Sequence, residues 1–234
     1  MSCWSWSVPA GPEGSCVYAT DYGICKSCYA RANRYNTDVV AKAQWIRYQW
    51  FKRMLVEDVD GLWAVIDGAI KKYCTNGYFR VFDSGDFSDP NEYYLWSRVA
   101  HTNPNVKFWV PTRTWRSEND KWISGLIVLQ NNRNVTLRLS ALEFNNPPPV
   151  FNGTMVITDN AAKPDNVWLC PKSVNGSSCE AEGCRVCWDY PNYPVAYFVH
   201  GMMGRHKQFE ISDKMLEQRV NLKHKYTTIT IGAT

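Results

Sequence analysis

No stretch of the 234-residue chain approaches the roughly 20 consecutive apolar residues that a membrane-spanning helix needs. The opening Met-Ser-Cys-Trp-Ser-Trp has neither the basic start nor the apolar run of a secretory leader, so we expect a cytoplasmic protein without a membrane partner. Low-complexity tracts and blocks of like charge are absent, as in an ordinary globular protein. A glycine-rich phosphate loop, a nucleophile elbow and a His-Glu-x-x-His motif are missing too, so nothing in the sequence indicates a nucleotide hydrolase, an α/β-hydrolase or a zinc protease.

Cysteine, in contrast, is plentiful, and most of the nine cysteines fall into two clusters. The first cluster has the spacing C-x8-C-x2-C and the second has C-x8-C-x4-C-x2-C; they consist of Cys16, Cys25 and Cys28, and of Cys170, Cys179, Cys184 and Cys187. A disulfide framework is the less favoured explanation, because such frameworks usually occur in short secreted chains with little apolar core. We interpret the two clusters as ligand sets in a reducing compartment.

The two clusters differ in their number of donors. A tetrahedral metal or an iron–sulfur cluster takes four ligands, so the second set is complete and the first is one ligand short. Three thiolates on a [4Fe–4S] cluster leave one iron open for a small molecule, whereas zinc at the first site would need a fourth donor such as Cys3 or a histidine. The second site could hold a second [4Fe–4S] cluster or zinc. Cys3 and Cys74 stand outside both sets, and we expect each to be a small buried residue.

Helical and strand patterns alternate along the rest of the chain, as in a parallel sheet covered by helices. Apolar spacing predicts helices at 37–57, 59–73, 90–100, 120–130 and 212–222, and strands at 78–83, 106–111, 135–139, 154–158 and 195–199. We expect a single domain over residues 1–234, with an N-terminal cluster loop at 1–36 and a cysteine-rich loop at 160–194. Because a closed eight-stranded barrel usually takes about 250 residues, this α/β pattern predicts a partial, open β/α barrel of about five or six mostly parallel strands.

Polar residues follow the predicted strands at their carboxyl ends, where parallel sheets bind ligands. They are Ser84, Gly85, Asp86, Arg113, Ser140 and Asp159. Asp86 could bind an ammonium group through a charge-assisted hydrogen bond, or it could be a carboxylate of a helix N-terminus or a turn. Arg113 could hold a carboxylate or phosphate with both of its terminal nitrogen atoms, or it could form a surface ion pair. The sequence therefore predicts a cofactor-binding site at this edge of the sheet.

Several motifs together resemble one known family. They are Val8-Pro9-Ala10-Gly11, Cys25-Lys26-Ser27-Cys28-Tyr29-Ala30, Gly85-Asp86-Phe87, Phe108-Trp109 with Thr112-Arg113, Cys170-Pro171, and Cys184-Arg185-Val186-Cys187-Trp188. This combination resembles the bacteriophage gene-product-eighty-eight group over about residues 1–190. The resemblance implies a phage protein that acts in the cytoplasm of the host cell.

The first cysteine loop also resembles the cluster loop of radical SAM enzymes, and Ser84-Gly85-Asp86 resembles the segment with which they hold S-adenosylmethionine (SAM). This resemblance implies a [4Fe–4S] cluster on the first three cysteines, whose open iron binds SAM. One electron passed into the sulfonium would then release a 5′-deoxyadenosyl radical. The loop differs from the usual C-x3-C-x2-C spacing, Tyr29 follows the last cysteine instead of preceding it, and Asp86 stands where those enzymes have Glu.

Three functions are compatible with these features. The first is a SAM-dependent iron–sulfur enzyme that needs an electron donor and acts on an unknown substrate. The second is a non-catalytic protein, stabilised by an iron–sulfur cluster or zinc, that binds nucleic acid or a host protein through its basic, aromatic surface. The net charge of +4 permits such a partner without requiring one. Residues 201–207 form a separate basic segment that could contact phosphate or be solvated surface. The third is a two-cluster electron carrier.

Overall fold

The computed structural model describes residues 3–146, 152–199 and 212–227. Within these residues the sheet is built from β1 (Trp4–Ser7), β2 (Tyr78–Ser84), β3 (Lys107–Thr112), β4 (Val135–Phe144), β5 (Thr154–Ile157), β6 (Trp168–Leu169) and β7 (Val195–Phe198). Every neighbouring pair is parallel, and the order across the sheet is β1-β2-β3-β4-β5-β7-β6. The sheet is open, because β1 and β6 lie at opposite edges. The predicted α/β class with parallel strands is therefore confirmed.

The sheet has seven strands, so the predicted number of about five or six is too low. The two strands that the sequence patterns missed, β1 and β6, are four and two residues long and lie at the edges. Such short edge strands contain too few residues to show an alternating pattern. Strand β4 is also longer than predicted, and its pairing with β5 is irregular between Ser140 and Phe144.

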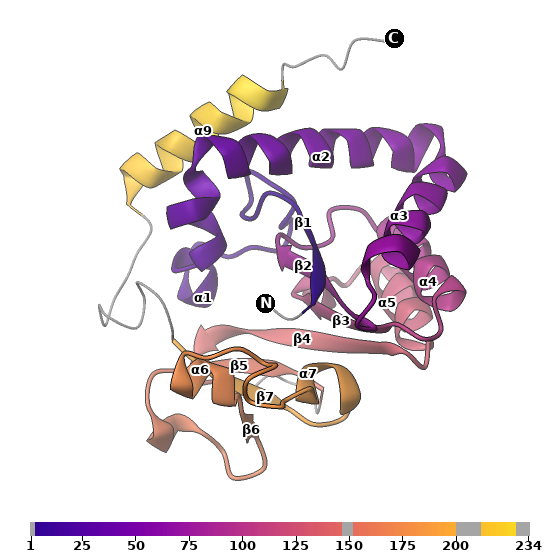
Figure 1. Ribbon diagram of the computed structural model, residues 1–234. Coiled ribbons are helices and arrows are strands. Elements are labelled where there is room, and N and C mark those ends of the chain that lie inside the picture. Colours follow the sequence, from indigo (N-terminus) through magenta and orange to yellow (C-terminus); the bar gives the residue numbers. More distant parts are fainter. Residues whose placement is uncertain (1–2, 147–151, 200–211, 228–234) are drawn as a thin grey trace.

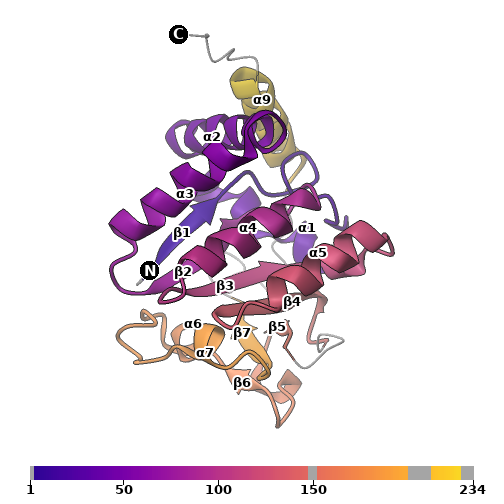
Figure 2. The same ribbon diagram turned by 90° about the vertical axis from the view of Figure 1, so that its right-hand side faces the viewer.

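The longer helices are α2 (Asp38–Glu57), α3 (Val59–Tyr73), α4 (Asn91–Thr102), α5 (Asp120–Gln130) and α9 (Asp213–Thr227). Shorter elements are α1 (Gly23–Lys26), α6 (Pro171–Asn175), α7 (Val186–Asp189) and the 3-10 turns Tyr29–Arg31, Asn33–Asn36, Thr114–Arg116 and Asn160–Ala162. In Figure 1, α2, α3, α4 and α5 form an arc beside β1 to β4, each packing against the next. Figure 2 shows α3, α4 and α5 side by side over one face of these strands, with α9 against α2. Among the described helices, none has the length and apolar composition to cross a membrane.

The main core lies between these helices and the face of the sheet that they cover. Alternate residues of β2 and β3 point into it, among them Phe79, Val81 and Phe108. The residues between them, such as Arg80 and Trp109, point to the other side, which we call the inner face. Helix α7, which carries part of the second cysteine cluster, packs against β3 and β4.

Local sequence determines where α4 begins, close to the carboxyl end of β2. Asp89 accepts a hydrogen bond from the backbone N–H of Asn91 (2.8 Å), and Glu92 accepts one from the backbone N–H of Asp89 (3.1 Å). These contacts satisfy N–H groups that the start of a helix otherwise leaves without a partner, as in a capping box. Pro90 suits this first turn because it has no N–H to satisfy. Asp89 and Glu92 thus cap the start of α4.

Candidate functional site

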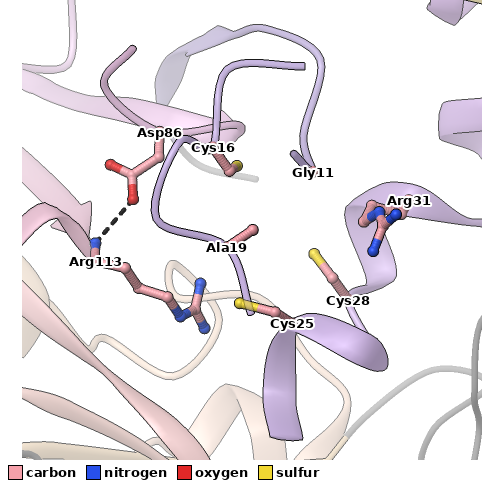
Figure 3. Close-up of a pocket in the computed structure, with 8 residues that line it drawn as sticks. All are labelled: Gly11, Cys16, Ala19, Cys25, Cys28, Arg31, Asp86 and Arg113. Carbon is pink, nitrogen blue, oxygen red and sulfur yellow. Dashed lines mark hydrogen bonds between the residues drawn. The ribbon is translucent and has the colours of Figure 1, made fainter. Parts of the chain in front are cut away.

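A small cavity of about 20 Å³ lies at the carboxyl ends of β2 and β3. Its lining consists of the first cysteine cluster (Cys16, Cys25 and Cys28), the strand-end residues Asp86 and Arg113, and Gly11, Ala19 and Arg31. In Figure 3 the three sulfur atoms border one space, and the guanidinium of Arg113 reaches toward Cys25 from the facing wall. The structure thus brings the first cysteine loop together with two of the predicted strand-end residues.

The close approach of the first loop to the end of β2 depends on Gly85. Its φ is +90°, and a Cβ atom here would lie 2.5 Å from the hydroxyl oxygen of Ser15. The Ser15 hydroxyl donates to the carbonyl of Pro9 (3.0 Å) and accepts from the N–H of Asp86 (3.0 Å). These contacts hold the residue next to Cys16 against the strand end, so the first thiol and Asp86 border the same cavity.

Two arginines hold the first loop from the other side through one carboxylate. Glu13 accepts hydrogen bonds from Nη2 of Arg31 (3.1 Å) and from Nε of Arg219 on α9 (2.5 Å). Arg219 is only 3% exposed and also donates to the carbonyl oxygen atoms of Ala10 (2.6 Å) and Ala30 (3.3 Å). Burial raises the pKa of Glu13, but the two guanidinium groups outweigh burial and hold this pKa below its usual value. The last described helix therefore fastens the loop that carries the first cysteines.

The carboxylate of Asp86 already has three donors from the protein. Oδ1 accepts from the hydroxyl of Thr112 (2.7 Å) and the N–H of Phe87 (2.8 Å), and Oδ2 accepts from the backbone N–H of Arg113 (2.8 Å). Burial raises the pKa of Asp86, and these hydrogen bonds oppose the rise. Since a carboxylate offers about four acceptor positions, roughly one stays for a ligand in the cavity. Asp86 therefore joins the ends of β2 and β3 and retains a limited capacity to bind.

The side chain of Arg113 places a positive charge beside the thiols. Its Nε lies 3.4 Å from the carbonyl oxygen of Ala141. Burial lowers the pKa of Arg113, but the nearby Cys25 and Cys28 and the Asp86 carboxylate outweigh burial and raise this pKa above its usual value. The guanidinium is therefore within electrostatic reach of the thiols, where it would stabilise thiolates or an anionic ligand.

Burial favours the neutral form of two thiols of the first cluster, those of Cys16 and Cys28. It raises the pKa of Cys16, and the nearby Asp86 carboxylate raises that pKa further. Burial also raises the pKa of Cys28, where the charge of Arg113 opposes the effect. Because metals bind the thiolate form, loading of this site with iron or zinc would release protons.

The second cysteine cluster also converges in space. Cys170, Cys179, Cys184 and Cys187 lie in one apolar cluster with Trp109, Val186, Trp188 and Val195. The backbone N–H of Cys184 donates to the carbonyl of Cys179 (2.9 Å), which folds the loop between them. Cys187 lies on α7, and its Sγ is 3.1 Å from the hydroxyl oxygen of Tyr197. Burial raises the pKa of Cys187 to about 12, and the hydrogen bond with Tyr197 opposes this rise.

Arg138 on β4 holds α7 in place beside the second cluster. It is fully buried and donates to the carbonyl oxygen atoms of Val186 (2.9 Å), Tyr190 (2.7 Å) and Tyr193. Its Nε and the Nε1 of Trp109 are also buried, and neither has a hydrogen-bond partner within the described part of the chain. A buried donor without a partner costs about 1–3 kcal/mol. Among the same described residues, buried N–H groups of Trp6, Trp63, Trp96 and Arg80 lack a partner as well, so this feature is not specific to the second cluster.

In residues 3–146, 152–199 and 212–227, no three His, Cys, Asp or Glu side chains lie close enough together to hold a single metal ion. The cysteines of the first set instead border a cavity. An iron–sulfur cluster spreads its thiolate ligands over several iron atoms, so the donors of both sets suit a cluster in their chemistry.

The remaining strand-end residues do not line the cavity. Ser84 is buried and donates its hydroxyl to a backbone carbonyl of the first loop (2.9 Å). Ser140 accepts an indole N–H at its carbonyl oxygen (3.1 Å), and Asp159 accepts a backbone N–H of the short turn that follows it (3.1 Å). Asp86 and Arg113 are therefore the strand-end residues that the structure places together with the cysteines.

The two remaining cysteines are not part of the first site. Cys3 packs against the second cluster near Cys179, a position that does not agree with a role as fourth donor at the first site. Burial raises the pKa of Cys3 to about 11. Cys74 is buried, and its Sγ lies 3.3 Å from the carbonyl oxygen of Tyr78. The basic segment 201–207 lies outside the described residues.

The sequence analysis missed four residues that support the two sites. Arg31 follows Cys28 closely, and its position could have indicated a role in the first loop. Arg138 and Tyr197 lie on strands, where a single polar residue usually indicates an exposed face. Arg219 lies on a helix with many charged residues, and nothing in the neighbouring sequence distinguishes it from them, because its partners belong to the first loop.

Comparison with protein families identifies a match over most of the chain. The family described as Gene product 88 matches residues 1–169. This range includes the first cysteine cluster, Asp86 and Arg113, and it ends before the second cluster begins at Cys170. No curated protein and no solved structure matches the chain.

Proposed function

This chain belongs to the gene product 88 family, and we propose that it is an iron–sulfur protein of the radical SAM type. Cys16, Cys25 and Cys28 hold a [4Fe–4S] cluster with one open iron, and the four cysteines from Cys170 to Cys187 hold a second cluster. SAM would be the small molecule at the open iron, where a bound cluster would supply one-electron chemistry.

The main support for this proposal is the set of residues that line the cavity. Three cysteines line it, and no fourth cysteine is among its described lining residues. Structural metal sites have four protein ligands, whereas reactive sites keep one position open. At the second site, four cysteines lie together in one apolar cluster, which supplies a complete set of four thiolate ligands.

The cavity wall offers contacts for both charged ends of the methionine part of SAM. The acceptor position that Asp86 retains suits the ammonium group, and Arg113 suits the carboxylate. The cavity volume of about 20 Å³ is enough for about one water molecule and far below the roughly 300–1,000 Å³ of small-molecule pockets. Binding of a cluster and of SAM therefore requires the first loop to move outward.

A two-cluster electron carrier is the second candidate, and the geometry of Asp86 favours it. Three donors within the protein already use most of the acceptor capacity of this carboxylate. A carrier needs no substrate site and would retain Asp86 only to join two strand ends. SAM binding distinguishes the two candidates.

We also propose that residues 1–234 form one domain whose sheet is an opened β/α barrel. Strands β1 to β5 follow chain order in the sheet, as barrel strands do. The ring of Trp109 on β3 stacks on that of Tyr197 on β7 at 6.5 Å, although β4 and β5 lie between these strands in the sheet. Such a contact across two strands is expected when a sheet curls. As a phage protein, the chain would act in the cytoplasm of the host.

The experiment that tests the two-site assignment counts iron, sulfide and zinc in three variants purified without oxygen. Cys25→Ala should lose the first cluster and Cys187→Ala the second, so each should lose about four irons. Cys74→Ala is the matched control, because Cys74 is buried but belongs to neither set. Unchanged iron in Cys25→Ala would contradict the first assignment, and zinc in place of iron would leave a structural, metal-stapled binding protein.

A further inference from the structure

The two cysteine sites are joined by a continuous series of side-chain contacts across the inner face of the sheet. The series consists of Tyr29, Arg80, Trp109 and Tyr197. We propose that it is an electron relay that carries single electrons between the two sites, an inference that rests on the proposed iron–sulfur function. Transfer between the two sites needs no substrate, because both ends of the relay adjoin a proposed cysteine ligand. Tyr29 follows Cys28 in the chain, and the hydroxyl of Tyr197 contacts Sγ of Cys187.

At the first site the relay begins with Tyr29, the residue that follows Cys28. Its hydroxyl donates to the carbonyl of Asp83 (2.8 Å), and Nη2 of Arg80 lies 3.4 Å from the same hydroxyl oxygen. Asp83 also pairs with Arg80 at 3.2 Å. The backbone of β2 is unusual here, since Phe82 has a φ of +64°, which bulky residues adopt only when their surroundings require it. The tyrosine and the arginine are therefore held against each other by a fixed strand end.

In the middle of the relay, Arg80 lies over the ring of Trp109. The two residues are register partners on β2 and β3, and Cζ of Arg80 is 4.3 Å from the ring centroid. Trp109 is only 9% exposed, so little water reaches this contact. The ring of Trp109 stacks on that of Tyr197, with centroids 6.5 Å apart and planes inclined by 24°.

At the second site the relay ends on a predicted ligand. The hydroxyl oxygen of Tyr197 lies 3.1 Å from Sγ of Cys187, and Trp109 belongs to the same apolar cluster as Cys187 and Cys170. Every neighbouring pair in the relay is thus in contact, from the chain neighbour of one cysteine ligand to the sulfur of another.

This arrangement has a physical consequence for electron transfer. Tunnelling falls exponentially with the width of the gap, so bonded and packed atoms carry an electron better than empty space or disordered water. The cation of Arg80 over the ring of Trp109 disfavours an oxidised indole. The ring therefore bridges the gap without becoming a radical itself. One electron enters at one site from a low-potential one-electron donor, which is oxidised, and then passes to the other site without making or breaking a bond.

The test is a one-electron flash reduction of protein that carries both clusters, with a photoreduced flavin as the donor. Electron paramagnetic resonance of samples frozen at increasing times follows the exchange of the electron between the sites. Trp109→Leu should slow this exchange by at least an order of magnitude, because the bridging ring is lost. Trp109→Phe keeps a ring at the same position, and we expect it to slow the exchange less than Trp109→Leu does. Trp122→Leu is the matched control, since Trp122 is also 9% exposed but lies outside the relay.

Iron content and both midpoint potentials are measured for each variant, so that a lost cluster or a changed driving force is not mistaken for slow exchange. A fully loaded Trp109→Leu protein with the wild-type rate would overturn the relay and leave the proposed function intact. A wild-type protein without two clusters would overturn both. If Trp109→Leu loses iron, Tyr29→Leu interrupts the relay at its other end. Slowing in that variant would support the relay, whereas an unchanged rate or a second loss of iron would overturn it.

Discussion

The contact between α9 and the first loop leads to a prediction about stability. Arg219→Met keeps the length and the apolar stem of the side chain but removes the guanidinium. Glu13 then has one ion-pair partner, Arg31, and the carbonyl oxygen atoms of Ala10 and Ala30 lose a donor. The change therefore breaks a buried network between residues that lie far apart in the sequence.

The size of the effect follows from the burial of this network. Breaking a buried ion pair by removing one partner usually costs about 3–5 kcal/mol. Since Arg31 still pairs with Glu13 in this variant, we expect a loss near the lower end of that range, about 3 kcal/mol in the free energy of unfolding. For a chain of this length, such a loss corresponds to a fall in melting temperature of about 6–12 °C.

The effect should also depend on pH, and the sign follows from the pKa of Glu13. The arginines lower this pKa from its ordinary 4.5 in the folded state. The stabilisation is therefore present above about pH 4.5 and is lost as the pH falls through the folded-state pKa. The difference between wild type and Arg219→Met should shrink accordingly in acid.

Urea unfolding followed by tryptophan fluorescence measures both effects. Lys225→Met is the control on the same helix, because Lys225 pairs with Asp38 at an exposed position (58% and 62% exposed), where an ion pair contributes little. We expect the control to unfold at the wild-type urea concentration. If Arg219→Met also unfolded there at neutral pH, the buried network would not fasten the first loop, and the reasoning would be refuted.

Four further predictions concern single side chains. Gly85→Ala should cost about 1 kcal/mol or more and reduce first-site iron, because the new Cβ meets Ser15; wild-type iron content would contradict this. Asp86→Asn should weaken SAM binding about tenfold in calorimetry while iron content is unchanged, and equal affinity would argue against a role of the carboxylate in binding. Arg138→Met should release iron from the second site alone, and an intact second signal in electron paramagnetic resonance would disprove its positioning role. Burial raises the pKa of Glu92 from 4.5 to about 8. Its folded form therefore favours the proton, and wild-type stability should fall between these pH values by at most about 1.4 kcal/mol per pH unit. Glu92→Gln should remove that fall in urea titrations, and an unchanged pH profile would show that Glu92 is not its source.

The fold could be predicted where a segment is long and its apolar period is clear. The helix predicted at 120–130 matches α5 (Asp120–Gln130), and the strand predicted at 78–83 matches β2 (Tyr78–Ser84) to within one residue. Strand β1 could not be predicted, because it has only four residues and two of them, Trp4 and Ser5, are exposed. Such a short segment shows no alternation of buried and exposed residues and resembles a loop. Its pairing with β2 depends on contacts with a distant part of the chain.

The candidate site could be predicted in part for a similar reason. The cysteine spacing grouped the cysteines that the structure brings together, and the position of Asp86 and Arg113 after strands placed them at one edge of the sheet. Ser140 was misleading, because β4 continues past the predicted strand end and leaves this residue within the strand. The roles of Arg219 and Trp109 depend on partners that are distant in the sequence and come close only in the folded chain. No local sequence pattern could therefore predict these roles.

The most direct test of the iron–sulfur account is the iron, sulfide and zinc content of protein purified without oxygen, combined with electron paramagnetic resonance of the reduced sample before and after addition of SAM. The account predicts about eight irons per chain and a signal that changes when SAM is added. Iron without a response to SAM would contradict the radical SAM assignment and favour the electron carrier. Zinc alone, or no metal, would contradict the account as a whole.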